Sequence, residues 1–351
     1  MREFKYTITA ADIEEGLDIR TIMRRQFSFS ARLRSKIKRN RTVYLNGEQT
    51  QVWITPKEGD VLTVAIPDET SYFEPEDVPV LPLYEDEDLL VVNKPAGYTV
   101  HPTRGHKSGT MANGVAKYML DTGQSFKIRF INRLDMETSG VLLLGKNQLS
   151  QGELMKQMKA DTVTKLYRAI VHGIPEEPQG VIDEALAYHR DGSLKRVVED
   201  DGKPSETHYR VIESFPAIPG ADEEDALAKA FSLVELDLKT GRTHQIRVHM
   251  AHIGCAVVGD SLYGEIENPE LHELPPKTET ADECGEQGIN FRDLPPRVSV
   301  DAALIGRQAL HSYFTAFDHP VTGKRIEVTA PLPEDMAQLL EKLRQRRTED
   351  K

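Results

Sequence analysis

The sequence predicts an α+β fold in two unequal parts, and three observations support this prediction. A strongly basic stretch comes first, an acidic and proline-containing segment follows, and the rest of the chain mixes expected strands with expected helices. The mixture lacks the strict strand–helix–strand rhythm of a doubly wound sheet, which favours the α+β class. With 351 residues, the chain is long enough to bury the core of one large domain beside a small one.

The first part is expected to be a compact module within residues 1–70. Apolar side chains are interspersed with basic ones in its helical stretch, and Ser30 is suited to cap a second short helix. The pattern then predicts strands at 42–45 and 61–66. The Asn-Gly pair at 46–47 predicts a type I′ hairpin turn after the first of them.

Positive charge is concentrated in this module, although the whole chain has a formal net charge of −12. Between residues 20 and 41 the sequence carries nine basic residues and no acid. A basic face of this kind repels itself, whereas phosphate groups would neutralise it, so we expect it to bind phosphate. A purely solvated face is the alternative. The side chains expected at this face are Arg32, Arg34, Lys36 and Lys38.

The second part, residues 84–345, is expected to form the larger domain, joined to the module by a linker at 71–83. Apolar runs predict its buried strands, and helical spacing predicts its helices. The expected strands are 89–93, 141–144, 165–171 and 233–238, the expected helices are 148–159, 243–253 and 333–343, and a final hairpin turns at 319–323. The acidic stretch 265–300 is expected to be a surface insertion.

Several classes of protein are not expected from the composition. No apolar run approaches the ~20 residues that a membrane span needs, and the N-terminus lacks the apolar core of a secretory signal. Two cysteines are too few for a disulfide framework, so a cytoplasmic protein is expected. The histidines within 244–252 do not share one helical face, so no metal site is expected. The sequence lacks nucleotide-binding glycine loops, which agrees with the expectation of no cofactor, and a monomer is favoured.

The loop 131–140 carries the densest set of chemistry-bearing residues, just before an expected buried strand. Such a loop can present a carboxylate, Asp135, and a guanidinium, Arg133, side by side at the rim of a sheet. The alternative is a surface ion pair, which contributes only ~0–1 kcal/mol to stability. Spacing alone leaves both interpretations open.

Three other places could hold functional side chains. Arg247 lies in the first turns of the expected helix 243–253, from which it could point toward an acid at the sheet. Tyr167 lies in an expected strand, where a tyrosine most often serves packing. Lys94 ends another strand before a Pro-Ala-Gly sequence, and a sharp turn alone would explain that pattern.

In number, order and spacing these motifs resemble the RluA family of pseudouridine synthases, in its subgroup with an N-terminal S-four-like RNA-binding module. The resemblance covers nearly the whole chain. Its motifs are the basic module, Tyr84–Pro95, Arg133–Asp135, Lys165–Tyr167, Gly202–Pro204, Gly241–His252, Gly259–Asp260, Tyr263–Gly264 and Gln308–His311. The family implies a catalytic domain on a large mixed, mainly antiparallel sheet with flanking helices.

The resemblance also implies roles for single residues. Asp135 would be the catalytic carboxylate, with Arg247 as its partner. Tyr167 would lie in the active site, stacking near the uracil and able to act as base. Arg133 would occupy the space left by a flipped uridine. Further contacts to substrate or RNA are expected at Lys94, Arg242 and His244.

One position departs from the family pattern, because Asn132 stands where the common form has histidine. This position is not the nucleophile, so the departure concerns the details of substrate binding. The implied function is isomerisation of uridine in structured RNA, first in large-subunit ribosomal RNA and second in transfer RNA. A non-catalytic RNA-binding or ribosome-assembly protein on the same scaffold is the alternative. A glycosidase would need a second catalytic acid.

Overall fold

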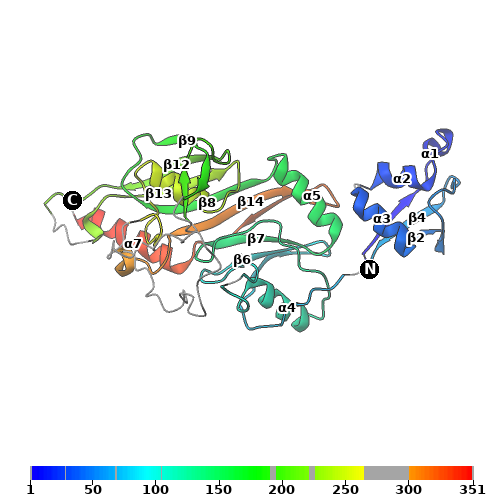
Figure 1. Ribbon diagram of the computed structural model, residues 1–351, viewed down its shortest axis with the longest axis horizontal. Helices are drawn as coiled ribbons and strands as arrows, with labels where there is room; N and C mark the ends of the chain where they lie inside the picture. Colours follow the sequence, from blue (N-terminus) through cyan, green and yellow to red (C-terminus); the bar gives the residue numbers. More distant parts are fainter. Residues whose placement is uncertain are drawn as a thin grey trace, which may run out of the picture.

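The computed structural model describes residues 2–27, 29–67, 69–103, 105–189, 195–220, 226–264 and 300–349. A small N-terminal module lies at one end of an elongated molecule, and the C-terminal helix α7 (Glu334–Glu349) lies toward the other (Figure 1). The insertion expected at 265–300 falls outside the described residues except for Val300. No helix of the described part is long and apolar enough to span a membrane.

The N-terminal module combines a four-stranded antiparallel sheet with three short helices. The strands run in the order β1-β4-β2-β3, with bounds β1 (Arg2–Thr7), β2 (Val43–Leu45), β3 (Glu48–Gln49) and β4 (Val61–Ile66). The helices are α1 (Ala10–Glu14), α2 (Ile19–Gln26) and α3 (Ala31–Asn40). The sequence does not predict β1, because Phe4 and Tyr6 are its only apolar side chains, yet all six of its residues pair with β4.

Two local predictions for this module are confirmed. The Ser30 side chain accepts a hydrogen bond from the Leu33 backbone N–H at 3.2 Å and so caps α3. Asn46 and Gly47 have φ values of 53° and 85°, the left-handed values that a type I′ turn requires. This turn joins β2 to β3.

The segment that follows the module lies against the larger domain. The Glu76 backbone N–H donates to the Asn113 carbonyl at 3.3 Å, and Val78 is buried beside helix α4 (Met111–Asp121). A Cβ added to Gly114 of that helix would lie 2.6 Å from the Val78 carbonyl oxygen, so glycine permits the close approach. This stretch of the expected linker is therefore packed rather than extended in solvent.

The larger domain is built on a nine-stranded, mainly antiparallel sheet, which confirms the predicted α+β fold. The order is β5-β6-β7-β14-β8-β13-β12-β9, and β15 pairs with β14 beside this path. The β7–β14 pair is parallel. The strand bounds are β5 (Pro82–Glu85), β6 (Leu89–Lys94), β7 (Ser139–Gly145), β8 (Thr164–His172), β9 (Gln179–Asp183), β12 (Glu206–Phe215), β13 (Phe231–Leu238), β14 (Leu310–Asp318) and β15 (Arg325–Thr329).

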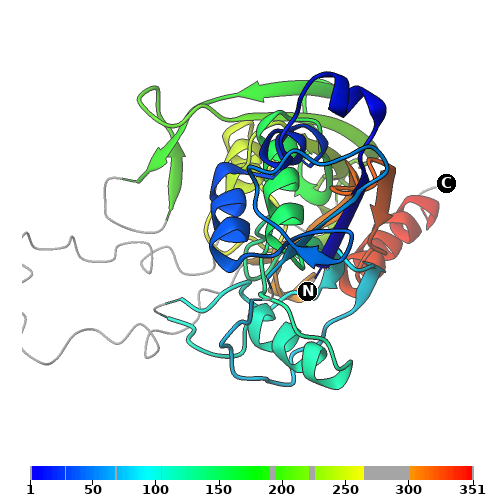
Figure 2. The same cartoon turned by 90° about the vertical axis from the view of Figure 1, so that its right-hand side faces the viewer.

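Helices and hairpins flank this sheet much as predicted. Helices α5 (Gln148–Lys159) and α6 (Gln245–His252) lie in the expected stretches, as does α7, and β14 and β15 form the expected final hairpin. Helix α6 starts later than predicted, because His244 has a left-handed φ of 59° and cannot belong to the helix. A separate hairpin of β10 (Leu186–Tyr188) and β11 (Arg196–Val198) reaches away from the sheet (green in Figure 2).

Strands β6 and β7 bury side chains on both of their faces. Leu90 and Val92 pack with α4 on one face, whereas Leu89 and Val91 pack with α5 and β14 on the other. Burial on both faces explains why this part of the sequence is a continuous apolar run rather than an alternating one. The loop that precedes β7 is thereby anchored in the rigid centre of the domain.

Candidate active site

The loop 131–138 carries Asp135 and is tied to β7 by Asn132. The Asn132 Nδ2 donates to the Val141 carbonyl at 3.1 Å, and its Oδ1 accepts from the Leu143 N–H at 2.8 Å. An amide side chain supplies the donor and the acceptor that these two bonds need. The residue that departs from the family pattern therefore holds the loop in place.

Lys94 supports the same loop and is fully buried. Its Nζ donates to the carbonyls of Pro95, Met136 and Thr138, each at 2.8 Å. Three carbonyls match the three N–H groups of an ammonium, while burial lowers the pKa of Lys94 to about 7. The predicted contact of Lys94 with substrate or RNA is wrong, because the enclosed side chain binds the main chain of the loop instead.

Arg247 lies in the first turn of α6 and contacts two carboxylates. Its Nε and Nη2 donate to Asp260 at 2.6 and 2.8 Å, and its Nη1 donates to the Asp135 Oδ2 at 3.3 Å. Burial alone would lower the pKa of Arg247. The hydrogen bonds and the negative charge of Asp260, together with the negative charge of Asp135, raise this pKa instead. The bidentate hydrogen bonding to Asp260 fixes the guanidinium in the orientation in which its Nη1 reaches Asp135.

Asp260 is a site residue that the sequence analysis did not assign. Its carboxylate is fully buried and also accepts hydrogen bonds from the backbone N–H groups of Leu262 and Tyr263 at 2.9 and 3.2 Å. The Gly-Asp motif at 259–260 was the one available signal. That motif does not say which cation the carboxylate would meet.

His244 is the second neighbour of Asp135. Its Nε2 lies 3.9 Å from the Asp135 Oδ2, and its Nδ1 lies 2.8 Å from the Tyr263 hydroxyl. That hydroxyl accepts a hydrogen bond from the Arg196 backbone N–H at 2.9 Å. We assign the tautomer in which the hydroxyl donates its own proton to Nδ1 and the imidazole proton is on Nε2, facing Asp135.

The imidazole of His244 is neutral at physiological pH. Burial lowers its pKa to about 4, although the negative charge of Asp135 acts in the opposite direction. Both His244 and Arg247 meet the Asp135 carboxylate at Oδ2. Neither of them bonds to the other oxygen, Oδ1.

Tyr167 lies in β8 and is buried near the same carboxylate. Burial raises the pKa of Tyr167 to about 12, against the effect of a hydrogen bond with Ser312, and the charge of Asp135 raises it further. The phenol is therefore protonated at neutral pH in the free protein. The structure brings Tyr167 to the site, but a phenolate base there would need a change in its surroundings.

Arg133, two residues before Asp135, and Arg242, two residues before His244, are both exposed. The positive charge of Arg133 adds to burial in lowering the pKa of His101, so these two side chains lie close together. The Arg242 Nε donates to the Pro204 carbonyl at 3.2 Å, which links the two expected motifs at 202–204 and 241–252. Both guanidinium groups can therefore meet a bound molecule.

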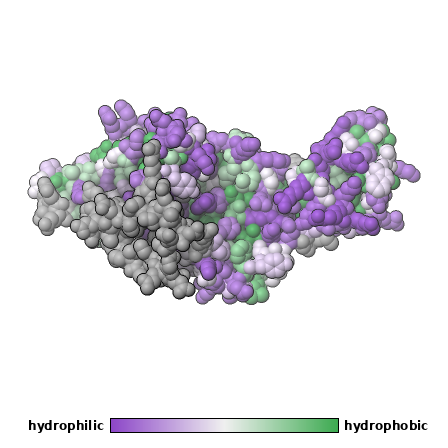
Figure 3. Space-filling view, in the orientation of Figure 1, coloured by the Kyte–Doolittle hydropathy of each residue, from purple (hydrophilic) through white to green (hydrophobic). Residues whose placement is uncertain are grey.

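The basic helix of the module presents its four expected side chains unequally. Arg32 and Lys38 are exposed, whereas Arg34 and Lys36 are half-buried. Arg34 donates to the Phe29 carbonyl, and the Lys36 Nζ lies 2.9 Å from the Glu69 Oε1. Hydrophilic residues (purple) cover much of the visible face of the module (Figure 3).

Four side chains with metal-ligand chemistry, His249, Asp86, Asp88 and His319, have protein partners. His249 bonds to the Thr207 hydroxyl at 2.9 Å and to the Glu184 carbonyl at 3.1 Å. Asp86, Asp88 and His319 lie close enough to form a possible metal-ligand set, because their ligand atoms lie within 4.8 Å of one another. There His319 bonds to Asp86 at 2.8 Å, and Arg2 donates twice to Asp88.

Comparisons with known proteins identify relatives over most of the chain. Residues 88–252 match the family model described as RNA pseudouridylate synthase. A Bacillus subtilis protein named as an uncharacterised RNA pseudouridine synthase, YlyB, is 36% identical over 308 residues, which cover 86% of each chain. The ribosomal large subunit pseudouridine synthase D of Pasteurella multocida is 33% identical over 90% of this chain and 86% of its own.

Solved structures of pseudouridine synthase domains have a similar fold. Human RNA pseudouridylate synthase domain containing 1 matches with a TM-score of 0.51 and 24% identity, covering 78% of this chain and 98% of that one. Human RNA pseudouridylate synthase domain containing 4 matches with a TM-score of 0.51 and 21% identity. The chain therefore belongs to the RluA family of RNA pseudouridine synthases, isomerases that convert uridine to pseudouridine.

Proposed function

We propose that this enzyme modifies uridine in large-subunit ribosomal RNA, with Asp135 as the nucleophile. The observation that carries the assignment is the Asp135 carboxylate, whose Oδ2 accepts a hydrogen bond from Arg247 at 3.3 Å, whereas neither Arg247 nor His244 bonds to its Oδ1. Relatives named ribosomal large subunit pseudouridine synthase D, 33–37% identical over most of the chain, support this RNA as the substrate. Transfer RNA is the second candidate.

The reaction needs a nucleophile and proton transfers but no redox step. Asp135 would add through Oδ1, either to C-1′ of the ribose or to the uracil ring. The bond between C-1′ and N-1 breaks, the uracil turns, and a bond forms between C-1′ and C-5. The proton lost from C-5 is balanced by one gained at N-1, and the carboxylate leaves unchanged.

The surrounding residues would position the reacting groups. Arg247 favours the ionised form of Asp135 by its adjacent positive charge. Tyr167, protonated in the free protein, would pack against the uracil or donate a hydrogen bond. Extruding a stacked uridine costs a few kcal/mol, and Arg133 would offset part of that cost by filling the vacated space.

Asp135→Asn tests the nucleophile, because the amide keeps the shape and loses the charge. We expect no pseudouridine in a large-subunit ribosomal RNA transcript, measured by carbodiimide treatment and primer extension, with RNA affinity within about twofold of the parent protein. The matched variant Asp121→Asn, on the exposed end of α4, should retain full activity.

Normal turnover by Asp135→Asn would disprove its role as nucleophile. Tight binding of ribosomal RNA by the unaltered protein without product, beside an active control enzyme, would favour the non-catalytic RNA-binding function. Product in transfer RNA alone would assign the second candidate substrate.

A further inference from the structure

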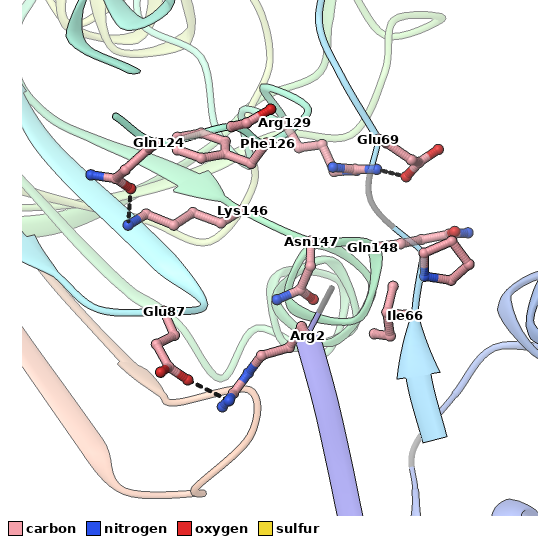
Figure 4. Close-up of a pocket in the computed structure, with 12 residues that line it drawn as sticks. Arg2, Ile66, Glu69, Glu87, Gln124, Phe126, Arg129, Lys146, Asn147 and Gln148 are labelled. Atoms are coloured by element: carbon pink, nitrogen blue, oxygen red, sulfur yellow. Dashed lines mark hydrogen bonds and ion pairs between the residues drawn. The ribbon is translucent and has the colours of Figure 1, made fainter. Parts of the chain in front are cut away.

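Two adjoining cavities lie between the N-terminal module and the larger domain, and Asp135 lines neither of them. Figure 4 shows the smaller of the two. The larger has a volume of about 540 Å³ and is lined by α3 on one side and by Lys127, Arg129 and the start of α5 on the other. The smaller, of about 300 Å³, shares Glu69, Arg129 and Gln148 with it. The composition of the larger cavity is unusual for a protein with a net charge of −12.

Positive charge in the larger cavity exceeds negative charge. Its lining holds a single carboxylate, Glu69, against five cations, which are Arg32, Lys36, Arg39, Lys127 and Arg129. Glu69 is shared, because one of its oxygens pairs with Lys36 at 2.9 Å and the other with Arg129, as Figure 4 shows for Arg129. In the part of the chain that the structure describes, the other three cations have no ion-pair partner.

The cations affect one another as like charges do. Burial lowers the pKa of Lys36, and the charges of Arg129, Lys127 and Arg39 lower it further. Burial also lowers the pKa of Arg129 to about 10. The Lys36 Nζ is buried without a well-formed hydrogen bond, although Glu69 lies near it. An anion in this cavity would relieve the repulsion and supply the missing acceptor.

The cluster is not needed to join the two parts of the protein. The Arg2 side chain donates to both oxygens of Asp88 in the larger domain, at 3.2 and 3.1 Å. Leu149 of α5 belongs to the apolar core of the module. Because these contacts already hold the two parts together, the excess of cations is better explained by binding of an anion from outside the protein.

We propose that this cavity binds a backbone phosphate of the RNA substrate from both sides, through Arg39 of the module and Lys127 of the larger domain. The inference rests on the proposed function, which supplies RNA as the polyanion. Both side chains are exposed, so they lie where an RNA strand can approach. One phosphate held from both sides also couples RNA binding to the placement of the module.

Lys127→Gln and Arg39→Gln, alone and combined, test the inference with a large-subunit ribosomal RNA transcript. Affinity is measured by filter binding between about 50 and 200 mM salt. One lost phosphate contact reduces the slope of log affinity against log salt concentration by about 0.7–0.9. Between the two salt concentrations, the affinity of each variant should therefore fall by a factor about three times smaller than that of the parent. Since both residues hold one phosphate, the double variant should fall well short of the summed single effects. The matched variant Lys342→Gln, on exposed α7, should behave as the parent.

Salt slopes like that of the parent in both single variants would overturn the inference, and fully additive effects would overturn the shared phosphate. An equal effect of Lys342→Gln would show unspecific charge dependence and would also overturn it. Circular dichroism confirms that each variant is folded. Pseudouridine is measured in parallel, because a parent protein that binds ribosomal RNA and makes no product disproves the proposed function and leaves the binding result intact.

Discussion

At the scale of single residues, the two oxygens of Asp135 have different surroundings. Arg247 and His244 both face Oδ2, and Asp260 fixes Arg247 by two hydrogen bonds. A carboxylate oriented through one oxygen presents the other in a defined direction. The Tyr263 hydroxyl extends this arrangement, because it sets which nitrogen of His244 carries the proton.

Tyr263→Phe tests this arrangement without touching Asp135. Without the hydroxyl proton, the His244 proton is free to move to Nδ1, and the ring no longer presents an N–H to the carboxylate. We expect the turnover rate to fall about tenfold, the size of one lost hydrogen bond, with RNA affinity unchanged. Tyr72→Phe is the matched control, since Tyr72 is 95% exposed. Equal turnover rates for the two variants would contradict the role of Tyr263.

At the scale of elements, the parallel pairing of β7 with β14 depends on one glycine. Gly140 has a φ of 108°, and a Cβ there would lie 2.1 Å from the Ser312 carbonyl oxygen of β14. A change of side-chain rotamer cannot relieve this contact, because the contacting atom belongs to the backbone of Ser312. The pairing in turn supports the strand that directly follows the Asp135 loop.

Gly140→Ala should therefore destabilise the protein. Positive φ alone costs an L-residue about 1–3 kcal/mol, and the clash adds to this, so we expect a loss of at least 2 kcal/mol in the free energy of unfolding by urea. Gly152→Ala is the contrasting variant, because a Cβ in that position of α5 meets nothing within 4 Å. It should stabilise the helix by about 0.5–1 kcal/mol. A neutral Gly140→Ala would show that the strands can separate freely.

The sequence predicts the elements better than it predicts their partners. The runs of β6 and β7 and the cap of α3 follow from local patterns, and so they are confirmed. Lys94 is misassigned because lysine is rarely fully buried, and two of the three carbonyls that hold it come from the distant Asp135 loop. Asp260 is missed because nothing local reveals that its carboxylate meets Arg247. Strand β1 is missed because its charged residues gain order only by pairing with β4.

At the scale of the whole molecule, the charge distribution divides the protein. The chain is acidic overall, yet the cavity between its two parts collects five cations around one carboxylate. Uniform acidity would repel RNA, whereas a local basic region attracts it and the surrounding acidity discourages binding elsewhere. Affinity for RNA is thus expected to depend on a few side chains rather than on the net charge.

Stability of the whole chain should fall as the solution becomes acidic. Burial lowers the pKa of His311 to about 4, and its Nδ1 lies 2.9 Å from the Ser139 hydroxyl. Since the unfolded chain takes up this proton near the ordinary value of 6.5, stability is full above that pH and is lost as the pH falls toward 4. The contribution of His311 alone should approach 1.4 kcal/mol per pH unit, in addition to that of His244, whose pKa is lowered in the same way. Both are measured by urea unfolding.

His311→Gln should lose that part of the pH dependence, because glutamine does not titrate. His106→Gln, at an exposed position, should leave the dependence as it is in the parent protein. Identical slopes for His311→Gln and the parent would show that another group governs acid unfolding.

The position of β14 has a consequence for how the protein is made. This strand comes from residues 310–318, yet it lies in the sheet between β7 and β8, which end before residue 173. The four strands of the module all lie within residues 2–66 and can pair early in synthesis. The sheet of the larger domain cannot be completed until residues 310–318 have left the ribosome. Until then β7 and β8 expose unpaired edges in the nascent chain, which makes this interval the one in which chaperones matter most.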